Sequence, residues 1–111
     1  MTPETTLKHL RNAYQAMVRV DDWMLAEVAK VRSMEARRRD IYNEQKALLE
    51  VPVTDVAALK QQLVDLQTES WKLHLALDAW YQGGRPKAQK IQRAAHTRWE
   101  KLAKKLLSAG A

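Results

Sequence analysis

Two pairs of side chains have the spacing of metal ligands or of a general acid and base. His74 and Asp78 are four residues apart, and so are His96 and Glu100, so each pair would share one face of a helix. A metal site needs a third or fourth ligand, and none follows at a useful spacing. No serine has the glycines of a nucleophile elbow around it, and no glycine-rich loop follows a strand. The sequence therefore predicts surface hydrogen bonds for both pairs, and a protein without catalytic residues, metal, cofactor or small-molecule substrate.

Positive charge is concentrated at the C-terminal end of the chain. Residues 85–111 contain eight Lys and Arg and one acid, whereas residues 1–84 contain eleven cations and twelve acids. The formal net charge of +6 therefore resides in the C-terminal segment. On a helix most of these cations would form a row at one-turn spacing, which suits a phosphate backbone and favours sequence-independent binding. The predicted nucleic-acid contacts are Lys87, Lys90, Arg93, Arg98, Lys101 and Lys105.

Other interpretations of this row of cations stay open. It would also serve as a solvated face that aids solubility and complements the helix dipole, or as a contact for an acidic protein partner. A membrane surface is a further option. Arg37, Arg38 and Arg39 add positive charge elsewhere, but three successive helical residues fan over about 200° and cannot all face one ligand.

Four tryptophans in a chain without Phe fall into two groups. Trp80 and Trp99 lie on apolar stripes and are predicted to pack in the core. Trp23 and Trp71 lie outside the main stripes, and with Tyr81 they are predicted to face a partner, because Trp and Tyr are enriched at binding hot spots. A broad apolar stripe near residues 17 to 31 completes the predicted protein interface, which consists of Met17, Trp23, Met24, Val28, Val31 and Trp71.

Helices must position these side chains. Ala, Leu, Lys, Arg, Glu and Gln are abundant and Gly and Pro are scarce, which is typical of long helical proteins. The predicted fold is all-α, with three helices at about 3–50, 55–82 and 86–108 in a single domain, 1–111.

The ends of these helices follow from short local signals. Thr2-Pro3-Glu4 is a start signal, because Thr2 can cap a helix whose first position suits proline. The proline in Val51-Pro52 ends the first helix, and Thr54 with Asp55 can cap the second. Gly83-Gly84-Arg85-Pro86 supplies a glycine stop and a proline restart, which predicts a break before the third helix.

Apolar residues recur at alternating steps of three and four in the first two helices, which is the spacing of a packing seam. In the second helix the predicted seam runs through Val56, Leu59, Leu63, Leu66, Ser70, Leu73, Leu77 and Trp80. In the first helix it runs through Leu7, Leu10, Tyr14, Met17, Asp21, Met24, Val28, Val31, Glu35, Arg38, Tyr42, Gln45 and Leu49.

The lengths of the helices raise a question of coverage. The first two are predicted to form an antiparallel, coiled-coil-like hairpin, and the third is a basic amphipathic helix. A second helix that starts near residue 55 covers only the C-terminal half of the first helix. Either the third helix continues onto the N-terminal half, or it folds back and a second subunit covers the apolar stripe. We favour a homodimer with an extended antiparallel core, with a monomeric three-helix bundle as the alternative.

The chain has no Cys, no basic start followed by an apolar run, and no stretch near the roughly 18 to 20 apolar residues of a membrane span. We therefore expect a cytoplasmic protein without a membrane segment.

Two functions of different classes follow. The first is a non-enzymatic helical dimer that contacts nucleic acid or a nucleoprotein complex through its basic C-terminal helix. The second is a protein-binding inhibitor, adaptor or small structural component that acts through its apolar, tryptophan-containing helix face. In size and helical composition the chain is similar to the accessory proteins that phages and plasmids carry.

Overall fold

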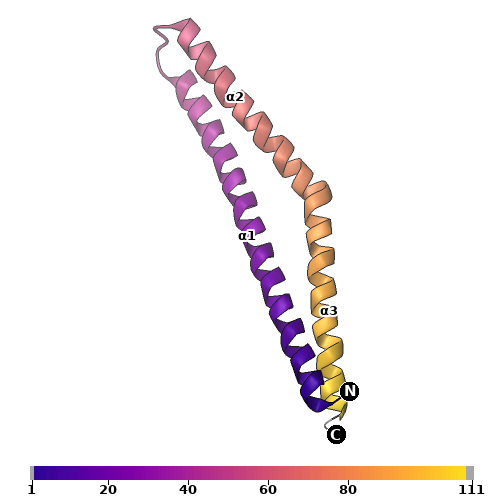
Figure 1. Cartoon of the computed structure of the whole chain (residues 1–111). Coiled ribbons are helices and arrows are strands. Elements are labelled where there is room, and N and C mark those ends of the chain that lie inside the picture. Colours follow the sequence, from indigo (N-terminus) through magenta and orange to yellow (C-terminus); the bar gives the residue numbers. More distant parts are fainter. Residues whose placement is uncertain (1, 110–111) are drawn as a thin grey trace. The chain divides into compact units, whose positions relative to one another are not determined.

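The computed structural model describes residues 2–109, and all regular structure in this range is helical (Figure 1). Helix α1 spans Pro3–Glu50, α2 spans Val56–Ala79, a π-helical segment η1 spans Trp80–Gly84, and α3 spans Arg85–Ala109. The all-α prediction is confirmed.

The first two predicted helix starts are made by side-chain caps. The backbone N–H of Thr5 donates to Oγ1 of Thr2 over 3.2 Å, and the backbone N–H of Ala58 donates to Oδ1 of Asp55 over 3.1 Å. Each cap binds one of the amides that have no partner inside the helix. The segment between α1 and α2 contains Pro52, as predicted.

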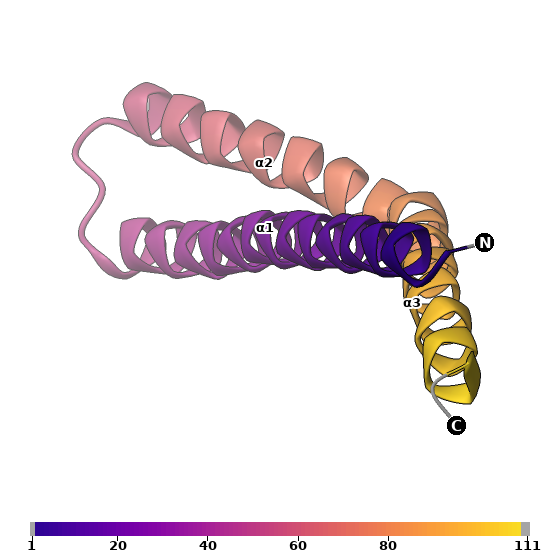
Figure 2. The same ribbon diagram turned by 60° about the horizontal axis from the view of Figure 1, so that its bottom comes forward.

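The predicted break at Gly83-Gly84 is wrong. Residues 56–109 are helical without interruption, so the described chain forms two continuous helical stretches rather than three helices (Figure 2). Neither glycine has a positive φ. Pro86 lacks a backbone N–H, and in a regular helix its ring would clash with the carbonyl group of residue 82. The wider π-helical turn ends at Gly84, two residues before Pro86, and gives the backbone a way to accommodate it.

The chain divides into two compact units, although one domain is the sequence-based expectation. Unit 1 contains residues 2–28 and 84–109, and unit 2 contains residues 29–83. The predicted glycine pair thus marks the division between units and not the end of a helix.

In unit 2, residues 29–50 of α1 and the helix α2 run antiparallel. Nε and Nη2 of Arg37 donate to the two carboxylate oxygens of Glu69 over 2.6 and 2.8 Å, and Nε2 of Gln45 donates to Oε1 of Gln67 over 3.2 Å. The predicted seam of α2 is buried or half-buried from Leu59 to Trp80, whereas its first member, Val56, is exposed.

The packing seam of α1 is offset by one residue from the predicted one at several positions. Ala13, Ile41 and Leu48 are buried or half-buried, where the prediction has Tyr14, Tyr42 and Leu49, which are exposed. Ile41 exposes 1% of its surface and Tyr42 exposes 68%. Two rows one residue apart satisfy the same spacing rule, and at Ala13 and Ile41 the structure buries the smaller side chain in place of the neighbouring tyrosine.

The main reason to expect a second subunit was that the N-terminal half of α1 needed a partner, and unit 1 supplies one. Here α3 packs antiparallel on residues 3–28 of α1, which contain the apolar stripe that the prediction left uncovered. The third helix therefore continues onto the N-terminal half of α1 and does not fold back.

Candidate nucleic-acid interface

Unit 1 holds its two helices together through small buried side chains and one polar cluster. Ala13 of α1 and Ala88 of α3 each expose 1% of their surface, and such small residues let two helices approach closely. The carboxylate of Asp21 accepts from Nε2 of Gln92 over 3.0 Å and from Nε2 of His96 over 2.8 Å. These contacts fix which face of α3 lies against α1.

The polar cluster also determines the charge of Asp21. Hydrogen bonds from Gln92 and then from His96 lower the pKa of Asp21 below its ordinary value of 3.8. Because both donors come from α3, the ionised form of Asp21 stabilises the contact between the two helices.

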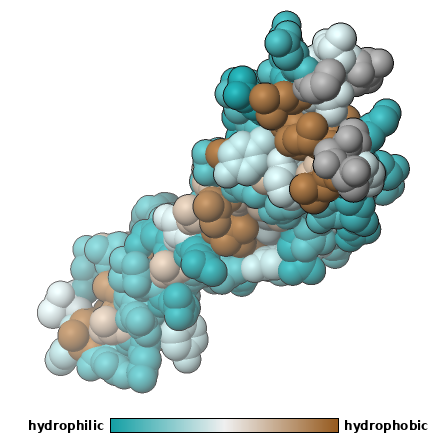
Figure 3. Space-filling model, turned by 90° about the horizontal axis from the view of Figure 1, so that it is seen from below, coloured by the Kyte–Doolittle hydropathy of each residue, from teal (hydrophilic) through white to brown (hydrophobic). Residues whose placement is uncertain are grey.

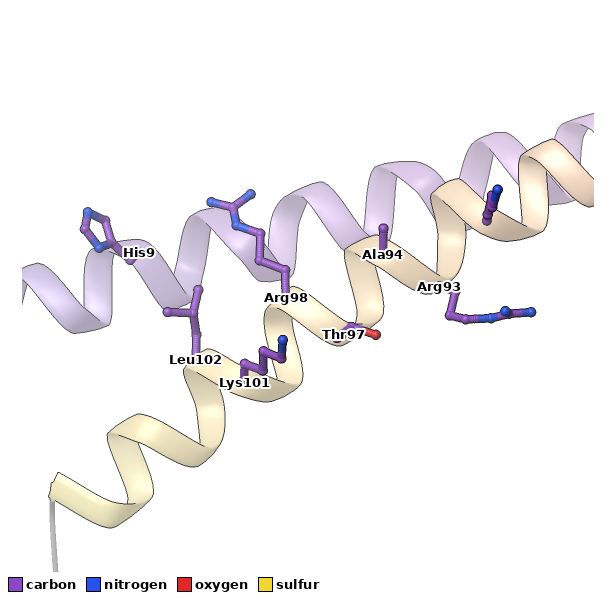
Figure 4. Close-up of a pocket in the computed structure, with 8 residues that line it drawn as sticks. His9, Arg93, Ala94, Thr97, Arg98, Lys101 and Leu102 are labelled. Atoms are coloured by element: carbon purple, nitrogen blue, oxygen red, sulfur yellow. The ribbon is translucent and has the colours of Figure 1, made fainter.

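A groove of about 830 Å³ runs along unit 1, and we call it the basic groove. One lining residue, His9, comes from α1 and the other seven come from α3 (Figure 4). The lining residues are His9, Lys90, Arg93, Ala94, Thr97, Arg98, Lys101 and Leu102. None of the lining residues within residues 2–109 is acidic, so no carboxylate among them competes for the four Lys and Arg.

The cations of the basic groove are unpaired. Lys90, Arg93, Arg98 and Lys101 are exposed, and none of them makes an ion pair or a hydrogen bond with another of the residues 2–109. Arg37 in unit 2 is the contrast, because it binds Glu69 with two nitrogens and Glu44 with a third.

The contrast between the two units extends to their total charge. Unit 1 contains eleven Lys and Arg and five Asp and Glu, whereas unit 2 contains eight of each, so the formal net charge of +6 belongs to unit 1. The Arg37-Arg38-Arg39 run belongs to unit 2 and lies outside the basic groove.

Four of the six predicted nucleic-acid contacts line the basic groove. The other two, Lys87 and Lys105, are exposed and continue the same face of α3 by one turn beyond Lys90 and Lys101. The sequence did not indicate His9, because only the pairing of α1 with α3 brings it to the groove.

The six predicted protein-interface residues differ in their exposure. Trp23 and Trp71 are 42% and 57% exposed, as a partner-facing surface requires. Val31 is buried in unit 2 with 6% exposure, so a partner cannot reach it, and this part of the prediction is corrected. The remaining members, Met17, Met24 and Val28, are half-buried.

Apolar side chains are also exposed near the start of α1 and the end of α3. Figure 3 views the molecule from below and shows hydrophobic side chains gathered on this face. Leu7 near the start of α1 and Leu107 near the end of α3 are 38% and 76% exposed.

The histidines of the two pairs noted in the sequence contact residues outside those pairs. His74 stacks on Trp71 with ring centroids 5.2 Å apart, and His96 binds Asp21 of α1. Asp78 accepts a hydrogen bond from Gln82. Within residues 2–109 no three His, Asp or Glu side chains are grouped as metal ligands would be.

No helix in the described range is both long enough and apolar enough to cross a membrane. Comparison of the chain with protein-family models, with curated proteins and with solved structures gives no match to any of them.

Proposed function

We propose that the protein binds nucleic acid through the basic groove of unit 1, without catalysis and without reading the base sequence. One observation supports this proposal above all others: four unpaired cations line one groove in which no carboxylate is present. Unpaired cations bind phosphates with little competition inside the protein, and each contact releases counterions from the nucleic acid.

The dimensions of the groove fit a run of phosphates. Lys90 and Lys101 are eleven residues apart on α3, which corresponds to about 16 Å at 1.5 Å per residue. A nucleic-acid strand advances about 3.4 Å per nucleotide along a duplex axis, so about five nucleotides span this distance. Four cations along five nucleotides allow nearly one contact per phosphate.

The other lining groups suit the same ligand. The hydroxyl group of Thr97 and the imidazole of His9 can donate hydrogen bonds to phosphate oxygens. Leu102 and Ala94 supply apolar surface for the sugar edge. Lys87 and Lys105 extend the row of cations at its two ends.

Titration of a fluorescein-labelled oligonucleotide with the full chain, followed by fluorescence anisotropy, tests the proposal. Binding at about 50 mM salt that weakens steeply toward about 200 mM is the expected result. A chain that stays folded by circular dichroism but binds no DNA or RNA at low salt would refute it.

Protein binding, including pairing of two copies, is the second candidate function. On α2 the residues Val64, Trp71 and Leu75 are spaced by seven and four, so they share one face of the helix. They are 48%, 57% and 51% exposed. This apolar face lies in unit 2 and is separate from the basic groove, so the two functions can coexist.

A further inference from the structure

Trp23 lies on the same side of α1 as the basic groove. His9, Ala16 and Trp23 are spaced by seven residues, which is close to two helical turns, so they follow one side of the helix. His9 is a lining residue of the basic groove. The side of α1 that borders the groove therefore leads to Trp23.

The register of the two helices places Trp23 at one end of the groove. Asp21 contacts Gln92 and His96, and Tyr14 contacts Trp99, so residue 23 lies opposite residues 90 to 94 of α3. Lys90 marks this end of the groove and Leu102 marks the other. A strand that follows the cations from Lys101 to Lys90 therefore ends at the level of Trp23 along the two helices.

The ring of Trp23 is free to accept a stacking partner. Of the other tryptophans, Trp71 stacks on His74 and Trp99 lies 6.0 Å from Tyr14, measured between ring centroids. Trp23 is 42% exposed, and no aromatic ring within residues 2–109 contacts it. Ile91, in the stretch of α3 that lies opposite residue 23, is 46% exposed and offers further apolar surface.

We infer that the ligand of the basic groove is a single nucleic-acid strand, and that one of its bases stacks on Trp23. This inference rests on the proposed function and names the form of nucleic acid that the groove takes. Cations that follow the backbone, beside an aromatic ring that receives a base, are the combination by which proteins bind single strands. In a duplex the bases are already stacked on each other, so only the cations of the groove would contribute.

Substitutions of Trp23 separate stacking from charge. The probes are labelled oligothymidylate and oligouridylate of about 20 nucleotides, and a DNA duplex of about the same length. Trp23→Ala and Trp23→Leu are expected to weaken binding of the single strands about 5- to 150-fold, with little effect on the duplex. Trp23→Phe retains a ring and should remain close to wild type. The two single strands also show whether the sugar, deoxyribose or ribose, affects affinity.

Tyr42→Ala is the matched control, because Tyr42 is an aromatic residue of α1 that is 68% exposed and lies in unit 2. It should leave binding of every probe unchanged. Stacking should also quench tryptophan fluorescence in the wild type, and this quenching should disappear in Trp23→Phe while binding persists. Circular dichroism establishes that each variant is folded.

Two results would contradict the inference in distinguishable ways. If the wild type binds strand and duplex equally, and the Trp23 variants bind as the wild type does, the stacking role is wrong and the proposed function stands. If no probe binds at low salt, the proposed function fails as well.

Discussion

Replacing Lys90 and Lys101 by glutamine removes two of the four cations of the basic groove. Glutamine has nearly the helix propensity of lysine, and both residues are exposed, so α3 should keep its fold. The matched control replaces Lys60 and Lys72, two exposed lysines of α2 in unit 2, in the same way. Both double variants lose the same charge, so a difference between them reports on the groove and not on net charge.

The expected magnitude follows from the number of groove cations. Each neutralised phosphate contributes about −0.7 to the slope of log affinity against log salt on a single strand. Four contacts therefore give a slope of about −2.8, and two contacts give about −1.4. Raising the salt concentration from about 50 to about 200 mM then weakens the wild type about 50-fold, and the groove variant about sevenfold.

The assay is an anisotropy titration of one labelled strand at four or more salt concentrations for the wild type and both double variants. The Lys60/Lys72 variant should keep the wild-type slope. Equal slopes for the two double variants would show that the bound phosphates lie elsewhere and that the basic groove is not the binding site.

Three further outcomes test other parts of the structure. Trp71→Glu should abolish self-association if α2 pairs two copies, and light scattering after size exclusion measures this; a monomeric wild type would refute pairing. Gly83→Ala should stabilise the chain to urea by about 0.5 to 1 kcal/mol, because the residue is helical, its φ is not positive and a Cβ would meet nothing within 4 Å. The lowered pKa of Asp21 means that its bonds to Gln92 and His96 stabilise unit 1 above its ordinary pKa of 3.8 and are lost as the pH falls through the lower folded value. Thermal unfolding of the wild type should therefore depend more on pH between about 5 and 2 than that of Asp21→Asn, and equal dependence would contradict the assignment.

The sequence predicted those parts of the fold that depend on local chemistry. Thr2 and Asp55 cap helices where they were expected to, and Pro52 separates α1 from α2. These signals act through hydrogen bonds and steric clashes with immediate neighbours, so no knowledge of the tertiary structure is needed to recognise them.

The wrong predictions concern features that tertiary packing determines. A glycine costs about 1 kcal/mol in a helix, and the packing of α2 and α3 on α1 can outweigh two of them. The seam of α1 was placed one residue away at Tyr42 instead of Ile41, because spacing alone does not show which of two adjacent rows faces the neighbouring helix. His9 was missed for a similar reason, since its role depends on the register between α1 and α3.

The π-helical turn η1 sets the rotational phase of everything that follows it. If the alternation of α2 continued past Trp80 and Gly84, positions 87, 91, 94, 98, 101 and 105 would face α1, and four of these are Lys or Arg. In the structure each of these six positions is exposed, and the residue after it is buried or half-buried. A π turn holds about one residue more than an α turn, and this surplus matches the offset.

The π geometry of η1, which takes up the surplus residue, thus keeps the charged side of α3 outward and its apolar side toward α1. If the same residues formed a regular α-helix in place of η1, α3 would be rotated by about 100°, and Lys87, Arg98 and Lys101 would point at the apolar stripe of α1. The packing of α3 on α1 and the exposure of the cations would then be lost together. The π geometry of η1 therefore governs the exposure of the basic groove, to which η1 contributes no side chain.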